Sequence, residues 1–148
     1  MAYESGRLYV ADTGDERVAV LGVDLALLAD LRHDEMKRPR DVSVGPDGAV
    51  VVAAEAGLLL FAPGGALLRV IGGECDVPCP VCVTFVSGSE LIAGCAGDAL
   101  CVWNLGGDLQ QVLRLGGAAA DLSGLCEYRG AVLLSDYRGD CVSWLDAK

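Results

Sequence analysis

A short apolar segment recurs four times in this chain at a nearly constant interval, and this repeat constrains the fold more than any other feature. The copies are spaced by 42, 41 and 41 residues and begin at Leu8, Val50, Leu91 and Val132. The first and last copies match without a gap at an offset of 124 residues, with Gly6–Asp12 on Gly130–Asp136. Such a period is typical of proteins that repeat one supersecondary unit.

Each period divides into four short runs rich in Val, Leu and Ile, separated by turn residues. In the second period the runs are Arg40–Val44, Ala49–Ala53, Leu58–Phe61 and Leu67–Ile71. In the third they are Val81–Val86, Glu90–Cys95, Ala99–Asn104 and Gln110–Leu115. The turn Gly45-Pro-Asp-Gly48 combines a fixed φ, a side chain that bonds the turn backbone and a residue that accepts positive φ. This pattern predicts four antiparallel strands per period.

Four strands in about 40 residues are typical of one blade of a β-propeller. We therefore predict an all-β chain of about three and a half blades that form an incomplete ring. The expected blades are 1–37 (partial), 38–76, 77–121 and 122–148 (partial). The innermost strand of the first blade is reduced to Met1–Glu4, and the last blade lacks its outermost strand.

Two blades carry motifs of a known kind. Pro39-Arg-Asp-Val-Ser-Val-Gly-Pro-Asp-Gly-Ala-Val-Val-Val-Ala53 and Tyr9-Val-Ala-Asp-Thr-Gly-Asp-Glu-Arg-Val18 resemble the NHL-repeat signature, including its "YVADxxNxRV" portion. The fourth blade keeps Asp136 but has Cys141 in place of the Arg. The resemblance implies a propeller that binds proteins or, in some members, RNA. Related families include metal-dependent lyases and hydrolases.

A second likeness leads to WD repeats. The segment Val83–Gly94, followed by Cys101-Val-Trp-Asn104, is similar to the second and third strands of that family. Asn104 stands where Asp is usual, and the chain has no Gly-His dipeptide. The NHL likeness is favoured, and another propeller family remains an alternative. All of them have the same four-stranded blade.

An incomplete ring would expose apolar blade faces at both ends, which need a cover. Missing blades in a longer chain are favoured, because the chain ends divide blades. Head-to-tail association of copies is the second alternative. A closed four-bladed ring, in which Met1–Glu4 completes the last blade, is the third.

In a propeller, the loops between second and third strands share one face with the connectors between blades. Here the loops are Asp12–Arg17, Ala54–Gly57, Cys95–Asp98 and Asp136–Asp140, and the connectors are Arg32–Arg40, Gly73–Pro80 and Gly116–Leu122. Function on a rigid scaffold usually lies in its loops. Candidate residues for binding an acidic protein or peptide are Arg17, Lys37, Arg38, Arg40 and Arg138. The alternative is a solvated connector whose charges offset each other.

Asp12 and Asp136 occupy matching positions before a tight loop. A carboxylate there can accept hydrogen bonds from loop amides, so we expect both to be structural loop caps.

Seven cysteines, an odd number, are spread along the chain, and most lie in apolar runs. We therefore expect reduced thiols in a reducing compartment. Cys75, Cys79 and Cys82, with His33 as a fourth ligand, form only a weak zinc signal, because a second knuckle is lacking. We expect no metal and no cofactor.

The charge balance narrows the functions further. Eleven basic and 21 acidic residues give a net charge of −10, which disfavours nucleic-acid binding. No apolar run is long enough for a membrane helix, and no signal peptide is visible, so we expect a cytoplasmic protein. A single histidine is a poor supply for catalysis. We predict a non-catalytic scaffold that binds a protein or peptide through one loop face. A fragment of a propeller enzyme and an RNA-binding propeller are the alternatives.

Overall fold

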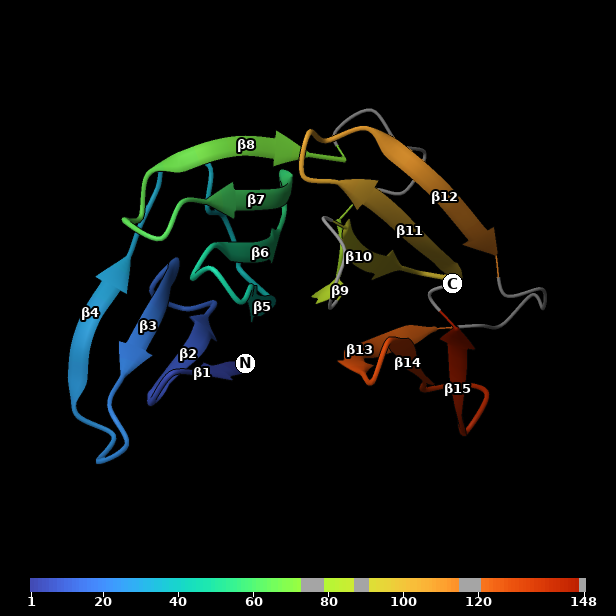
Figure 1. Cartoon of the computed structure of the whole chain (residues 1–148), viewed down its shortest axis with the longest axis horizontal. Helices are drawn as coiled ribbons and strands as arrows, with labels where there is room; N and C mark the ends of the chain where they lie inside the picture. Colours follow the sequence, from blue (N-terminus) through green and yellow to red (C-terminus); the bar gives the residue numbers. More distant parts are fainter. Residues whose placement is uncertain (73–78, 87–90, 115–120, 147–148) are drawn as a thin grey trace.

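The computed structural model describes residues 1–72, 79–86, 91–114 and 121–146, and these residues form β-strands without any helix (Figure 1). The strands make four antiparallel sheets, three with four strands and one with three. Strands that follow each other in the chain are neighbours in each sheet. Each sheet is one blade, which confirms the predicted all-β propeller architecture. In these ranges, no helix could cross a membrane.

The strands follow the predicted period. Blade 1 contains β1 (Ala2–Glu4), β2 (Arg7–Asp12), β3 (Arg17–Leu21) and β4 (Leu27–Leu31). Blade 2 contains β5 (Asp41–Val44), β6 (Val50–Ala54), β7 (Gly57–Phe61) and β8 (Leu67–Ile71). Blade 3 contains β9 (Cys82–Val86), β10 (Leu91–Ala96), β11 (Ala99–Asn104) and β12 (Leu109–Arg114). Blade 4 contains β13 (Leu122–Tyr128), β14 (Ala131–Asp136) and β15 (Cys141–Asp146).

The pairing of the first strand tests the alternative of a closed four-bladed ring in which Met1–Glu4 completes the last blade. β1 pairs with β2, with Ala2 opposite Tyr9 and Glu4 opposite Arg7. The N-terminal residues therefore complete blade 1, and the alternative in which they complete the last blade is wrong. Blade 4 has three strands in the described part of the chain, as predicted.

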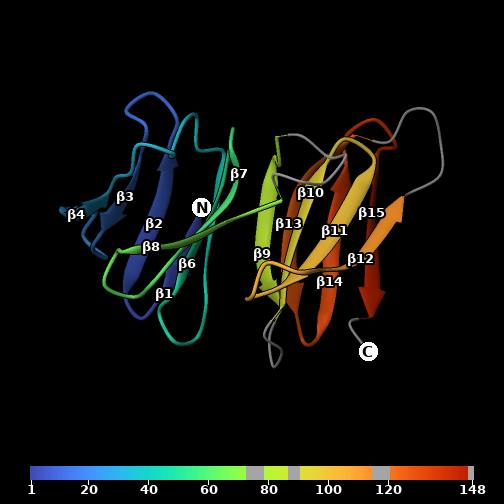
Figure 2. The ribbon, with the colours of Figure 1, turned by 90° about the horizontal axis from the view of Figure 1, so that it is seen from above.

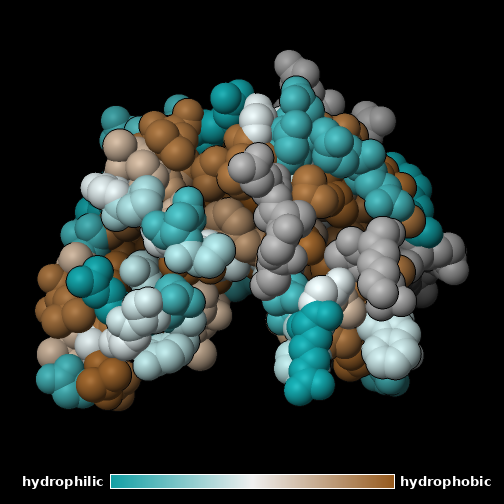
Figure 3. All heavy atoms as spheres, viewed as in Figure 1, coloured by the Kyte–Doolittle hydropathy of each residue, from teal (hydrophilic) through white to brown (hydrophobic). Residues whose placement is uncertain are grey.

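The blades stand side by side around a central channel (Figures 1 and 2). The innermost strands β1, β5, β9 and β13 line a cavity of about 540 Å³, and β4, β8 and β12 form the rim. Successive blades pack against each other from blade 1 to blade 4. The described residues show no comparable packing between blade 4 and blade 1, and a deep notch separates these two blades (Figure 3).

The hydrophobic core lies between the blades. One cluster joins blades 1 and 2 around Val18, Val52 and Phe61. A second joins blades 2 and 3 around Leu58 and Ile92, and a third joins blades 3 and 4. Every residue of β6 and β7 is buried, because a neighbouring blade covers each face of blade 2. Strands covered on both faces become continuous apolar runs, which explains the sequence pattern.

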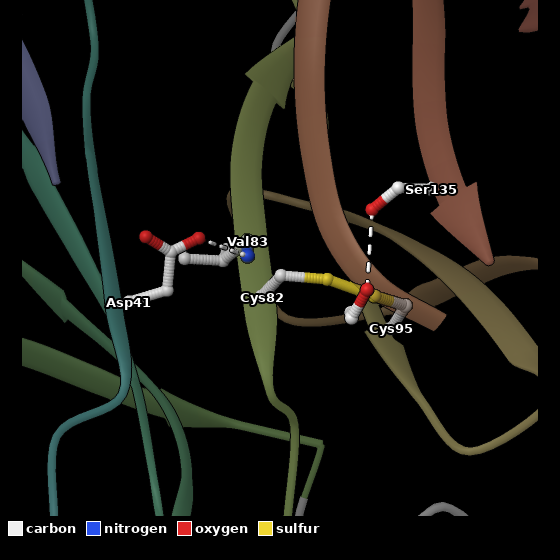
Figure 4. The surroundings of a disulfide bond; sticks show 6 residues. Asp41, Cys82, Val83, Cys95 and Ser135 are labelled. Carbon is white, nitrogen blue, oxygen red and sulfur yellow. Dashed lines mark hydrogen bonds between the residues drawn. A yellow bond between two sulfur atoms is a disulfide. The ribbon is translucent and has the colours of Figure 1, made fainter. Parts of the chain in front are cut away.

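Polar contacts also join neighbouring blades near the channel. A carboxylate oxygen of Asp41 accepts a hydrogen bond from the Val83 backbone N–H at 3.1 Å (Figure 4). The Ser43 hydroxyl accepts one from the Phe85 N–H at 3.2 Å. Both donors belong to β9, so the inner strand of blade 2 supplies acceptors to the inner strand of blade 3.

A disulfide bond joins Cys82 and Cys95 (Figure 4). These residues are directly opposite each other on β9 and β10, and both are buried on the face toward blade 4. The prediction that all the cysteines are reduced is wrong for this pair, because strand register brings together two thiols that are 13 residues apart. The cysteine-based argument for a reducing compartment therefore fails. Cys79, Cys126 and Cys141 are free cysteines in the described part of the chain.

Removal of the disulfide should destabilise the protein. We expect the double substitution Cys82→Ala and Cys95→Ala to lower the free energy of unfolding by about 2–3 kcal/mol, the size expected for a cross-link over a short loop. Denaturant titration with and without a reducing agent measures this change. The reducing agent should destabilise the wild type but not the double variant, and Cys126→Ser, at an exposed free cysteine, should match the wild type. An equal effect of the reducing agent on wild type and double variant would contradict the assignment.

Candidate partner-binding face

Hydrogen bonds hold hairpin loops against the connectors between blades. The Glu55 N–H donates to the Lys37 carbonyl at 2.9 Å, which joins the β6–β7 hairpin to connector 32–40. The Tyr137 N–H donates to the Asp121 carbonyl at the same distance and joins the β14–β15 hairpin to the connector before blade 4. We call the surface formed by the β2–β3, β6–β7, β10–β11 and β14–β15 hairpins with their connectors the loop face. Connector residues 73–78 and 115–120 lie outside the described residues.

Connector 32–40 is anchored to the core at two points. The Met36 side chain is fully buried in the cluster between blades 1 and 2, and Pro39 is buried as well. The Thr13 hydroxyl donates to the Pro39 carbonyl at 2.6 Å, and the Arg40 N–H donates to the Ala53 carbonyl at 2.8 Å. The connector is therefore part of the scaffold as well as a polar surface. Met36 could have been found in the sequence as the only apolar residue between Leu31 and Pro39.

Three of the five predicted binding residues are engaged in ion pairs. Arg17 contacts Asp12 at 3.1 Å, Asp15 at 3.3 Å and Asp30 at 3.6 Å, and these carboxylates raise the pKa of its guanidinium. The Lys37 ammonium lies 2.7 Å from Glu16, whose hydrogen bond and charge raise the pKa of Lys37.

The third of the paired residues is Arg138, whose guanidinium lies 3.6 Å from the Asp121 carboxylate. An incoming acidic ligand would have to compete with these internal carboxylates.

Arg38 and Arg40 differ from the other three. Both side chains are exposed, and neither guanidinium has an ion pair or hydrogen bond within the described ranges. Their backbone is held by the buried Pro39 between them and by the hydrogen bond from Arg40 to Ala53. The loop face thus presents two arginines, two positions apart, on a fixed segment.

Asp12 and Asp136 both accept hydrogen bonds within their hairpins. One oxygen of Asp136 accepts from the N–H groups of Asp121, Arg138 and Gly139 at 3.0–3.1 Å. These bonds, the one from Asp121 first, hold the pKa of Asp136 below its usual value. Asp12 accepts from Arg17 Nε and from the Asp15 N–H, and the bond from Arg17 is the main reason for the lowered pKa of Asp12.

Of the residues considered for zinc, Cys79, Cys82 and His33 have other partners. Cys82 is in the disulfide, and Cys75 lies outside the described residues. The Cys79 thiol donates to the Glu55 carbonyl at 3.8 Å. His33 Nδ1 accepts the Glu35 N–H at 3.2 Å, and its ring lies edge-on to Phe61. In the described part of the chain, no three residues of ligating type are grouped for a metal ion.

Solved structures similar to this chain are propellers. The computationally designed Ika4 protein matches with a TM-score of 0.70 and 17% identity, over 99% of this chain and 89% of that one. The WD40 propeller domain of Doa1 matches with a TM-score of 0.73 and 19% identity, over 94% of this chain and 46% of that one. Virginiamycin B lyase from Staphylococcus aureus matches with a TM-score of 0.76 and 9% identity, over 98% and 53%.

These likenesses show the β-propeller fold. No family model matches the sequence, and no curated protein matches it either. The NHL resemblance is therefore not confirmed, and the similar structures include WD40 propellers and a lyase. The chain spans about half the length of Doa1's domain and of the lyase.

The hydrogen bonds to Asp136 predict a pH dependence of stability. Because folding lowers the pKa of this carboxyl from its ordinary value of about 3.9, its stabilising effect is complete above that value and is lost as the pH falls through the lowered pKa. We expect wild type to be more stable than Asp136→Asn near neutral pH, and the difference to shrink below about pH 4. Thermal unfolding at several pH values measures it.

Asp140→Asn, in the same hairpin, is the control, because it removes a carboxyl of the same type without removing the cap. A difference between wild type and Asp136→Asn that stays constant with pH would contradict the role of Asp136.

Proposed function

We propose that this chain is a non-catalytic propeller scaffold that binds an acidic segment of a protein or peptide on its loop face. The observation that carries the proposal is the pair Arg38 and Arg40, exposed and without a partner for either guanidinium among the described residues. A guanidinium forms two parallel hydrogen bonds with a carboxylate, so this pair fits two acidic side chains of one partner.

The rigidity of connector 32–40 supports this function. A backbone that is already held in place loses less conformational entropy on binding, so a preorganised site binds more tightly than a flexible one. Met36, Pro39 and the hydrogen bond from Thr13 hold this segment against blades 1 and 2. Loops on a rigid scaffold are a common place for recognition.

The net negative charge of the chain favours binding of an acidic partner at a specific site over long-range electrostatic attraction. With a net charge of −10, the protein repels polyanions at long range, so an acidic partner has to be held by close contacts. The same charge opposes the RNA-binding alternative, because binding to RNA relies on neutralised phosphates.

The environment of the histidine supports a non-catalytic role. The single histidine uses Nδ1 to accept a backbone N–H and packs against Phe61, which fits a structural role for it. The likeness to the lyase concerns the fold alone. The NHL resemblance of blades 1 and 2 fits the proposal, since it implies propellers that bind proteins or, in some members, RNA.

Substitution of both arginines should abolish most of the binding. We expect fluorescently labelled peptides rich in Glu and Asp to bind the wild-type chain, and Arg38→Ala with Arg40→Ala to weaken that binding at least about tenfold, because a hydrogen bond to a charged group contributes ~1.5–3 kcal/mol. Fluorescence anisotropy measures the dissociation constants.

Arg7→Ala with Arg129→Ala is the matched control. These exposed arginines lie at the β1–β2 and β13–β14 turns, at the opposite ends of their strands from the loop face, and their removal changes the net charge equally. The control should bind the peptides like the wild type. An equal loss in both double variants, or wild-type protein that binds none of the peptides, would refute the proposed site.

A further inference from the structure

Blade 4 carries an apolar face that no described part of the chain covers. Val132 and Leu134 of β14 are buried against blade 3. Because side chains alternate along a strand, Leu133 lies on the opposite face, with Trp144 directly across from it on β15. Trp144 is 78% exposed and Val142 is 71% exposed. A hollow of about 460 Å³ lies over Leu133, Val142, Ser143 and Trp144.

Blade 1 carries a second face of this kind, which the described residues also leave free. Its Tyr9, Ala11 and Val18 pack toward blade 2. The alternate residues therefore face away from blade 2, and they are Leu8, Val10, Ala19 and Leu21. Tyr3 is across from Leu8 and Leu27 is across from Leu21, and they are 66% and 55% exposed. Toward the loop face this surface ends in the ion pairs of Arg17, which give it a polar rim.

The contacts inside the chain show how such faces mate. We call the face of a blade that lies toward the following blade in the chain its forward face, and the opposite face its backward face. At each junction, the forward face of one blade packs on the backward face of the next. At the junction of blades 2 and 3, Leu58 and Leu60 meet Ile92 and Trp103 in this way. The free face of blade 4 is a forward face and the free face of blade 1 is a backward face. A forward face and a backward face are the two that pack together at every junction in the chain.

We propose that two copies of this chain associate head to tail, with blade 4 of each copy packed on blade 1 of the other. The two contacts are identical, and a two-fold axis along the channel relates them. Both apolar faces of both copies are then buried, and this arrangement leaves no end open. The proposal is independent of the proposed peptide binding.

The blade count favours two copies over any larger number. Two chains of four blades make a ring of eight, which is within the range of four to eight blades found in closed propellers. Three chains would make twelve, outside that range. The half-length matches to solved propellers agree, since two arcs of this size have about the length of one such chain.

The solution mass tests the proposal directly. Light scattering on a size-exclusion column should give about 30.6 kDa for the 148-residue chain, twice its 15.3 kDa. We expect Val142→Glu with Trp144→Glu to give 15.3 kDa, and Tyr3→Glu with Leu27→Glu to do the same. All four side chains are more than half exposed, so their replacement should leave the fold intact. Circular dichroism checks this.

A mixture of the two double variants distinguishes head-to-tail pairing from other contacts. Each variant keeps the face that the other has lost, so an equimolar mixture should recover a dimer through one intact contact, weaker than the wild-type dimer. Leu68→Glu with Leu109→Glu is the control, because these exposed leucines lie on outer strands of blades 2 and 3 and should leave the dimer unchanged.

Several results would overturn the proposal. A wild-type chain of 15.3 kDa at every concentration would show that the free faces do not bind a second copy. A dimer that persists in the blade 1 variant would show that blade 4 pairs with blade 4. A mixture that stays monomeric, or an open-ended polymer, would exclude the closed ring of two.

Discussion

The structure depends on the burial of apolar strand faces between neighbouring blades. A single four-stranded sheet of this size has two apolar faces and cannot cover either of them by itself. β6 and β7 are buried at every position because blades 1 and 3 lie on either side of them. Hydrogen bonds from the β9 backbone to the side chains of Asp41 and Ser43 also join the inner strands of blades 2 and 3. The end blades follow the same rule, but each has one face that no described residues cover.

The loop face is a consequence of this packing. Since the blades repeat around the channel, hairpins and connectors recur at one end of the sheets, where backbone hydrogen bonds such as Glu55 to Lys37 tie them together. Met36 extends the core into connector 32–40, so charged residues on either side of it are held in place. Within this segment the basic side chains differ: Lys37 is paired with the Glu16 carboxylate, whereas the exposed Arg38 and Arg40 have no ion pair among the described residues.

The sequence predicted the scaffold better than the site. The runs of blades 2 and 3 predicted the strands to within one or two residues, because alternating turn signals and apolar runs are local features. The disulfide was missed, since Cys82 and Cys95 meet only through the register of β9 with β10. The sequence does not show that Asp30, from another strand, joins Asp12 and Asp15 around Arg17, one of the predicted binding residues.

The sequence by itself determined the blade, its period and the number of strands, because these follow from local turn chemistry and from apolar runs that only neighbouring blades can cover. Only the tertiary structure decided which thiols are joined, which basic side chains are paired and which apolar faces remain open. Those properties depend on distances between residues of different strands and blades. The neighbours Leu133 and Leu134 on β14 show the difference: alternation places them on opposite faces of the sheet, but only packing decides that Leu134 is the one that meets blade 3.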